Sequence, residues 1–224
     1  MPTSAPPRNR FERRRAETRN ALVRAARQIL AETGDTSVSI QAIADRADVG
    51  FGSFYNHFQS KAELFDAAVA DALEEFGQAI DKSLEGVEDP AELVAGGFRL
   101  TARMVDSHPE LMRVLRHRGL THIHSDRGLA PRARRDLERG ITSGRFLPVD
   151  PAVAVSATGG ALLSLVELRF SRPDLDGEEA AASLAEMALR MLGVPLDEAH
   201  EVTRRPLPTP ADTHTTPQSP TDAT

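Results

Sequence analysis

The spacing of apolar residues constrains the fold most strongly, because they recur every three or four positions in nearly every segment of the chain. Between about Phe11 and Thr33 they form one stripe, which consists of Leu22, Ala25, Ala26, Ile29 and Leu30. No segment longer than about four residues alternates apolar and polar side chains as a half-buried strand would. We therefore predict an all-α fold with about nine helices.

Capping residues and prolines mark where most of these helices begin. Proline suits the first helical position, because its missing N–H would have no partner there in any case. A capping residue, a proline or both open the helices predicted from residues 40, 61, 90, 109 and 151. Gly34 and Gly193 end the helices predicted at 11–33 and 178–192, and two more helices are expected at 52–58 and 131–143.

The two ends of the chain lack helical periodicity. Residues 1–11 contain three prolines, and residues 195–224 are rich in proline and threonine, so we predict a disordered basic arm and a disordered tail. Between them the sequence predicts a small domain at 12–60 and a larger helical domain at 61–194.

Charge is distributed unevenly between these parts. The chain has a net charge of −6, but residues 1–61 hold ten basic and six acidic residues, whereas the remainder holds 17 basic and 27 acidic ones. A basic head on an acidic body is the asymmetry expected when only one domain contacts nucleic acid. The arginines of the arm (Arg8, Arg10, Arg13, Arg14, Arg15 and Arg19) either follow DNA phosphates or only keep the chain soluble.

Several classes of function find no support in the sequence. There is no cysteine, and His117, His122 and His124 lack partners at a metal-binding spacing, so we expect no metal site and no cofactor. The motifs of serine hydrolases, zinc proteases, P-loop enzymes and dinucleotide-binding enzymes are missing, and we expect no enzyme activity. No apolar stretch suggests a secretory signal or a membrane span, which predicts a cytoplasmic protein.

The helices predicted at 40–47 and 52–58 are joined by a tight turn at Asp48-Val49-Gly50, which is the spacing of a helix-turn-helix. In that motif the second helix enters the major groove of DNA. Because Phe54 and Phe58 are expected to face inward, hydrogen-bonding and aromatic side chains remain on the outer face. The pattern alone leaves open whether this face binds DNA or is an ordinary surface.

The run from Ser39 to Lys61 resembles the DNA-binding domain of the TetR/AcrR family of regulators, and Ser53–Lys61 with Leu64-Phe65 is its most specific part. The resemblance covers residues 18–76. It implies an all-α homodimer that binds operator DNA and carries a divergent C-terminal effector domain. Most members of this family are repressors that a ligand releases.

The resemblance also implies roles for individual residues. Ser39, Tyr55, His57 and Lys61 occupy positions that contact phosphates in the family. Gln41, Phe51, Ser53 and Asn56 occupy positions that usually contact bases, where Gln suits adenine and an aromatic ring suits a thymine methyl group. For Phe51, packing onto the preceding helix remains the alternative.

The C-terminal domain is less informative. The helix from Pro151 carries apolar and small residues on nearly all of its sides. The resemblance implies that this helix and the last one pair with their symmetry mates in a homodimer. An effector cavity is expected among the middle helices, with the candidates Phe98, Met104, Leu111, Leu115, Ile123, Phe146, Leu163, Glu167 and Phe170. Glu167 either orients a ligand or pairs with a basic residue.

Together these features predict a ligand-responsive, DNA-binding transcription regulator that is a repressor released from its operator by a small molecule. The alternative is a helical protein-interaction module without sequence-specific DNA binding. That alternative leaves both the basic head and the Tyr55–Lys61 run unexplained.

Overall fold

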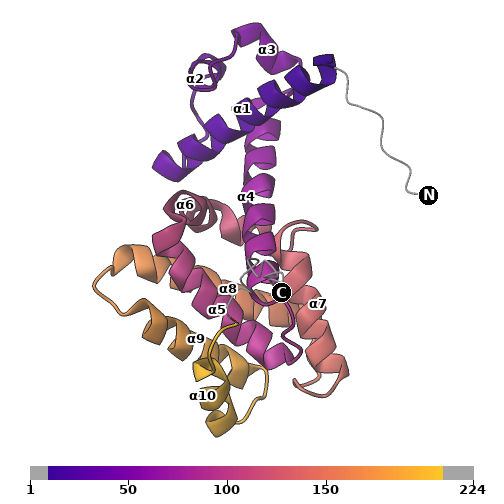
Figure 1. Cartoon of the computed structure of the whole chain (residues 1–224), viewed down its shortest axis with the longest axis vertical. Helices are drawn as coiled ribbons and strands as arrows, with labels where there is room; N and C mark the ends of the chain where they lie inside the picture. The colour runs from indigo at the N-terminus through magenta and orange to yellow at the C-terminus, as the bar shows by residue number, and fades with distance from the viewer. Residues whose placement is uncertain (1–9, 209–224) are drawn as a thin grey trace, which may run out of the picture.

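The computed structural model of the chain describes residues 10–208, and nearly all of them are helical (Figure 1). Within this range ten α-helices and one short 3-10 helix follow one another: α1 (Arg10–Thr33), α2 (Ile40–Arg46), α3 (Phe51–Tyr55), α4 (Lys61–Ser83), α5 (Pro90–Ser107), α6 (Pro109–Arg118), η1 (Gly119–His122), α7 (Leu129–Thr142), α8 (Pro151–Ser171), α9 (Gly177–Met191) and α10 (Leu196–Arg204). No strand occurs among these residues, which confirms the predicted all-α fold.

The first three helices form a small group at the top of Figure 1. The predicted apolar stripe of α1 is buried, with Leu22, Ala26 and Leu30 fully covered. The chain leaves α1 at Gly34, whose φ of +67° lies in the left-handed region that glycine adopts without strain. The N–H of Gly34 donates to the Leu30 carbonyl at 2.9 Å, which closes the helix as the sequence predicts.

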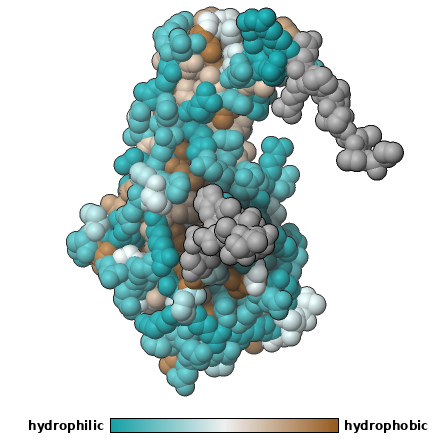
Figure 2. Space-filling model, in the orientation of Figure 1, coloured by the Kyte–Doolittle hydropathy of each residue, from teal (hydrophilic) through white to brown (hydrophobic). Residues whose placement is uncertain are grey.

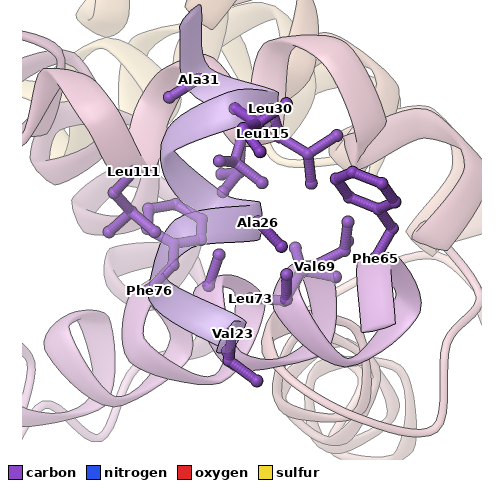
Figure 3. Packing of buried hydrophobic residues seen from close by; sticks show 14 of the residues in the cluster. Val23, Ala26, Leu30, Ala31, Phe65, Val69, Leu73, Phe76, Leu111 and Leu115 are labelled. Atoms are coloured by element: carbon purple, nitrogen blue, oxygen red, sulfur yellow. The ribbon is translucent and has the colours of Figure 1, made fainter. Parts of the chain in front are cut away.

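The long helix α4 connects this small group to the larger one below it (Figure 1). Two hydrogen bonds similar to those of a capping box start it: the Glu63 N–H donates to Ser60 Oγ at 3.2 Å, and the N–H of Gln59, the residue before the cap, donates to the Glu63 carboxylate at 2.7 Å. Figure 3 shows the buried side chains of α1, α4 and α6 meeting in one cluster. The two groups of helices therefore share a continuous core, so a shift of α4 or α6 is felt by α1.

The second core cluster lies among α5, α7, α8, α9 and α10 and includes Phe98, Leu137, Leu165 and Leu189. Proline occupies the first turn of α5, α6 and α8, as predicted. The side chains of Asp89 and Asp150 cap α5 and α8 by accepting hydrogen bonds from backbone N–H groups at 2.9 and 2.7 Å.

Helix α8 is long and apolar enough, by length and composition alone, to cross a membrane. It packs against α5, α6, α7 and α9, and the core side chains Leu165 and Val166 are fully buried. One such helix in a helical core is weak support for a membrane protein. Only 28% of the most apolar 18-residue stretch of this helix is buried within the chain, so a large part of the helix is not fully covered.

The C-terminal part corrects the sequence analysis. A helix, α10, occupies residues Leu196–Arg204, where a disordered tail is predicted to begin at residue 195. Ala199, Val202 and Thr203 are buried at helical spacing against α5 and α9, a stripe too short to stand out in a polar segment that follows Pro195. The remainder of the predicted tail from residue 209, and residues 1–9 of the predicted arm, lie outside the described residues.

Two smaller differences concern helix boundaries. Helix α3 ends at Tyr55 rather than at residue 58, because the chain turns after it and the N–H groups of His57 and Phe58 both donate to the Phe54 carbonyl at 3.0 Å. Helix α1 begins at Arg10, so the last two residues of the predicted arm are helical.

Candidate nucleic-acid interface and ligand cavity

Helices α2 and α3 lie at the end of the molecule that is farthest from α9 and α10 (Figure 1). The turn between them includes Asp48, the one non-glycine residue with a positive φ (53°) among residues 10–208. The Val49 N–H donates to the Ala44 carbonyl at 3.0 Å, which folds the turn back onto α2. The predicted helix-turn-helix is therefore present, and Phe54 and Phe58 are buried beneath it as expected.

Two aromatic rings dominate the outer face of α3. Phe51 is 46% exposed and Tyr55 is 56% exposed, and apolar atoms reach the surface at this end of the molecule in Figure 2. The two rings meet edge to face with centroids 5.9 Å apart, and Tyr55 rests in the same manner on the buried Phe54 at 5.3 Å. The rings are thus held in place while half of each remains free to contact another molecule.

The polar candidates of α2 are also exposed. Ser39 is the N-cap of α2 and accepts a hydrogen bond from the Ala42 N–H at 3.1 Å, so its hydroxyl has a structural task. Gln41 donates to the Asp45 carboxylate at 2.6 Å, one turn further along the same face. Ser53 lies half-buried on α3, and Asn56 is exposed directly after it.

Lys61 has a contact that its sequence position does not reveal. Its ammonium group donates to the backbone carbonyls of Ser37 and Val38 at 3.1 and 2.8 Å. The first residue of α4 therefore ties down the segment that leads into α2. An ammonium group has three donors, and these contacts use two of them.

Positive charge from α1 surrounds the end of the motif. Arg15 donates to the Asn56 carbonyl at 3.5 Å, and the guanidinium of Arg19 lies over the Phe58 ring at 5.2 Å. Burial, and then the charges of Arg15 and Arg19, lower the pKa of His57 below its usual range. Arg10, Arg13, Arg14, Arg15 and Arg19 are exposed on α1, whereas Arg8 lies outside the described residues.

A cavity of about 310 Å³ lies between α4, α5, α7 and α8. Most of its wall is apolar, with Ile80, Leu84, Phe98, Leu129, Leu137 and Leu162. A smaller cavity of about 60 Å³ shares Leu129, Ala133, Gly159 and Leu162 with it and extends towards η1. The combination of an apolar wall and a few charged groups is typical of a small-molecule site.

The charged groups of the cavity join α4 to α7. The Arg132 guanidinium donates to Asp81 at 2.6 Å and to Glu74 at 2.7 Å, both of which lie on α4. This contact, with a hydrogen bond from Gln78, lowers the pKa of Glu74 to about 2. Arg135 pairs with Asp136 at 2.9 Å and also reaches Asp81 at 3.5 Å. Asp81, Arg132 and Asp136 therefore meet at one side of the cavity.

Four of the nine predicted cavity residues line a cavity: Phe98 lines the larger one, and Leu115, Ile123 and Leu163 line the smaller one. The other five do not. Met104 and Leu111 are buried in the first core cluster, because α5 and α6 present those faces to neighbouring helices. Phe146, in the segment between α7 and α8, is buried in the second cluster. Phe170 lies beneath the guanidinium groups of Arg113 and Arg116.

Glu167 is the fifth residue outside the cavities. It pairs with Arg116 through two hydrogen bonds of 2.6 and 2.8 Å, which is the ion-pair alternative that the sequence analysis weighs against ligand orientation. Sequence reasoning missed Asp81, Arg132 and Asp136, because charged residues on polar helices give no signal of a cavity. Across residues 10–208, no three metal-ligating side chains lie together.

Two family profiles match the chain and together cover most of the described residues. Residues 22–68 match the family described as bacterial regulatory proteins, tetR family. Residues 89–205 match the family described as tetracyclin repressor-like, C-terminal domain. The first match contains the helix-turn-helix, and the second contains the helices that form most of the cavity.

Individual relatives agree with these matches. The HTH-type transcriptional regulator HbdR of Aromatoleum sp. (strain CIB) is 26% identical over 139 residues, which are 58% of this chain and 60% of HbdR. UidR of Escherichia coli (strain K12), also an HTH-type transcriptional regulator, is 26% identical over 191 residues, 79% of this chain and 91% of UidR. The crystal structure of RolR with its ligand resorcinol is 34% identical, with a TM-score of 0.61 and coverage of 88% of this chain and 98% of RolR.

Proposed function

The chain belongs to the TetR family of bacterial transcriptional regulators, and we propose that it is a repressor which leaves its operator when a small molecule enters the cavity beside α4. One observation carries this proposal: α4 starts against the helix-turn-helix and ends in the cavity wall. Lys61 at its first position holds the segment before α2, and Asp81 near its last turn lines the cavity.

We propose that α3 and the start of α2 contact operator DNA. Phe51, Gln41, Ser53 and Asn56 then contact base edges, and their exposure or half-exposure at one end of the molecule supports these roles. Ser39, Tyr55, His57 and Lys61 contact phosphates. The lowered pKa of His57 favours its neutral form, in which one ring N–H is a donor.

The partly uncovered surface of α8 supports a homodimer, as is typical of the family. Val153 on α8 and Met187 and Met191 on α9 are all more than half exposed, so these two helices leave apolar surface uncovered. Small residues further along α8 than Val153, including Ala157 and Gly160, allow another helix to approach closely. Two half-sites of the operator should then lie about 10 bp apart or a multiple of it.

We propose that the effector is a small aromatic molecule with hydroxyl groups. The apolar wall suits a ring, and Asp81 and Asp136 are placed to accept hydrogen bonds from hydroxyls while Arg132 donates one. RolR, at 34% identity, has been crystallised with resorcinol, which has this chemistry. No enzyme activity is needed for this role, and we propose that the protein acts in the cytoplasm, where operator DNA lies.

The proposed coupling between the two sites follows from the ion pairs of Arg132. A hydroxyl that bonds to Asp81 or Arg132 competes with their contact, and this contact holds α4 against α7. The shift of α4 is then transmitted through the shared core to α1 and to the segment that Lys61 holds. Ligand and operator oppose each other, so each must weaken the binding of the other by the same factor.

The first experiment selects operator duplexes from random DNA and measures their binding by fluorescence anisotropy at about 50 and 200 mM salt. Sequence-selective, salt-sensitive binding is expected, and no preference over random DNA would favour the interaction-module alternative. Resorcinol should release the operator, whereas 1,3-dimethoxybenzene, which has the same ring but no hydroxyl donor, should not. Binding without release by resorcinol would refute the proposed effector class and leave the DNA-binding role intact.

The chain provides a matched control for the phosphate role of Lys61, because its only other lysine, Lys82, is exposed at the far end of α4. Lys61→Met should lower the salt dependence of binding by about one counterion per subunit, and Lys82→Met should not change it. A loss of affinity with an unchanged salt dependence would show that Lys61 acts only through the Ser37 and Val38 carbonyls.

A further inference from the structure

The segment that follows α10 packs against α5. Two arginines hold it there, Arg205 from the segment and Arg99 from α5. The Arg205 guanidinium pairs with Glu92 on α5 and with Glu201 on α10, the latter at 2.7 Å. Arg99, also on α5, donates to the backbone carbonyl of Arg205. These contacts hold Arg205 against α5, two residues before Leu207.

Leu207 is placed by this fastening against the wall of the larger cavity. A methyl group in place of the Gly96 hydrogen on α5 would lie 2.6 Å from a terminal carbon of Leu84 and 3.5 Å from one of Leu207. The two leucine side chains therefore converge on the same glycine. Leu84 lines the cavity and is 6% exposed, and Gly97, the next residue on α5, lines it as well.

Leu207 and Leu84 both lie outside the two stretches that match the family profiles. The C-terminal profile covers residues 89–205 and ends two residues before Leu207. Leu84 likewise lies in the stretch between the two matched regions, 22–68 and 89–205.

We propose that Leu207 is a positioning residue for the effector cavity, because it holds Leu84 against Gly96 and so determines the shape of the wall that an effector meets. This inference rests on the proposed effector site. Without Leu207, the Leu84 side chain can turn into the space that is vacated, and the cavity then widens beside α5. Small ligands lose contacts in the wider cavity, whereas ligands with an added alkyl group gain room.

The test compares Leu207→Ala with Leu196→Ala, the same substitution at an exposed leucine of α10. Calorimetry with resorcinol and 4-hexylresorcinol should show that Leu207→Ala weakens resorcinol binding about fivefold and moves the ratio of the two affinities towards the hexyl compound by about tenfold. Operator affinity without ligand should equal that of the wild type. Leu207→Met should restore the ratio, and Leu196→Ala should leave it unchanged.

A loss of both affinities by the same factor would overturn the proposal, because it would show general destabilisation without a change of cavity shape. Hydrogen exchange of the ligand-free protein is a second measurement that needs no ligand. Backbone amides of residues 84–87 and 93–98 should exchange faster in Leu207→Ala than in the wild type, and those of α1–α3 should not. If resorcinol does not bind the wild type, the proposed effector class fails. Unchanged exchange at 84–98 would then still refute the role of Leu207.

Discussion

The exposed ring of Phe51 predicts that operator recognition depends on a methyl group of thymine. The ring is 46% exposed and is held by Tyr55, so it presents a rigid apolar edge where the major groove offers the 5-methyl group of thymine. Replacement of thymine by uracil removes that methyl group and leaves the hydrogen-bonding groups of the base pair unchanged. The perturbation therefore isolates the apolar contact.

The expected loss of operator affinity follows from the free energy of burying one methyl group. Burial of one methyl group against an apolar surface contributes about 0.8 kcal/mol, which corresponds to about fourfold in affinity. A homodimer makes this contact once in each half-site, and the two sites are far enough apart for their effects to add. Replacement at the contacted position in both half-sites should therefore weaken binding by about fifteenfold.

The assay measures anisotropy of selected operator duplexes in which each thymine is replaced by uracil in turn, in both half-sites together and at one salt concentration. Wild-type protein should show the loss at one position, and Phe51→Ala protein should bind the thymine and uracil duplexes equally. Tyr55→Phe is the control, because it keeps the ring contact and removes only the proposed phosphate contact of the hydroxyl. It should weaken all duplexes alike.

Two outcomes would refute this reasoning about Phe51. If no thymine position is sensitive to uracil, the ring does not contact a methyl group. If the sensitivity persists in Phe51→Ala, another side chain makes the contact, and Phe51 serves only to pack against Tyr55.

Three further predictions concern stability and coupling. Gly34→Ala should lower the free energy of unfolding in urea by at least about 1 kcal/mol, because Gly34 has a φ of +67° and the added methyl group would collide with the His117 ring; an unchanged value would show that the helix end relaxes freely. Arg132→Met removes the contact that holds α4 against α7, so it should weaken ligand-free operator binding and reduce the further weakening that resorcinol causes by about tenfold or more; unchanged operator binding without ligand would contradict the proposed coupling. The folded pKa of Glu74, about 2, lies below its usual 4.5, so its ion pair stabilises fully above about pH 4.5 and this stability is lost as the pH falls towards 2. The stability difference between wild type and Glu74→Gln, measured by urea unfolding between pH 6 and 3, should therefore shrink in acid; a constant difference would show that Glu74 titrates normally.

The positions of most helices could be predicted from local sequence because their signals are local. Asp89 and Asp150 cap α5 and α8 through backbone N–H groups within two residues of themselves. Gly34 ends α1 through its own positive φ. Such interactions depend on neighbouring residues alone, so their effect is the same whatever the rest of the chain does.

Of the two candidate sites, the helix-turn-helix could be predicted from local sequence and the cavity could not. The helix-turn-helix has a local spacing and a recognisable run of residues, and the structure brings its candidates together at one end of the molecule. The cavity is formed by helices far apart in sequence, and its charged side consists of Asp81 from α4 and Arg132 and Asp136 from α7. No local pattern indicates that these residues meet, and five of the nine predicted cavity residues lie elsewhere.

By itself the sequence determined the helical class, the capped starts of most helices and the DNA-binding motif, because each depends on periodicity, capping or a contiguous run of residues. The tertiary structure alone decided which side chains line the cavity, that Lys61 is bonded to the Ser37 and Val38 carbonyls, and that α10 and Leu207 pack onto α5. The physical reason is that burial and ion pairing depend on which faces of distant helices meet, and those faces are determined by the packing of the whole chain.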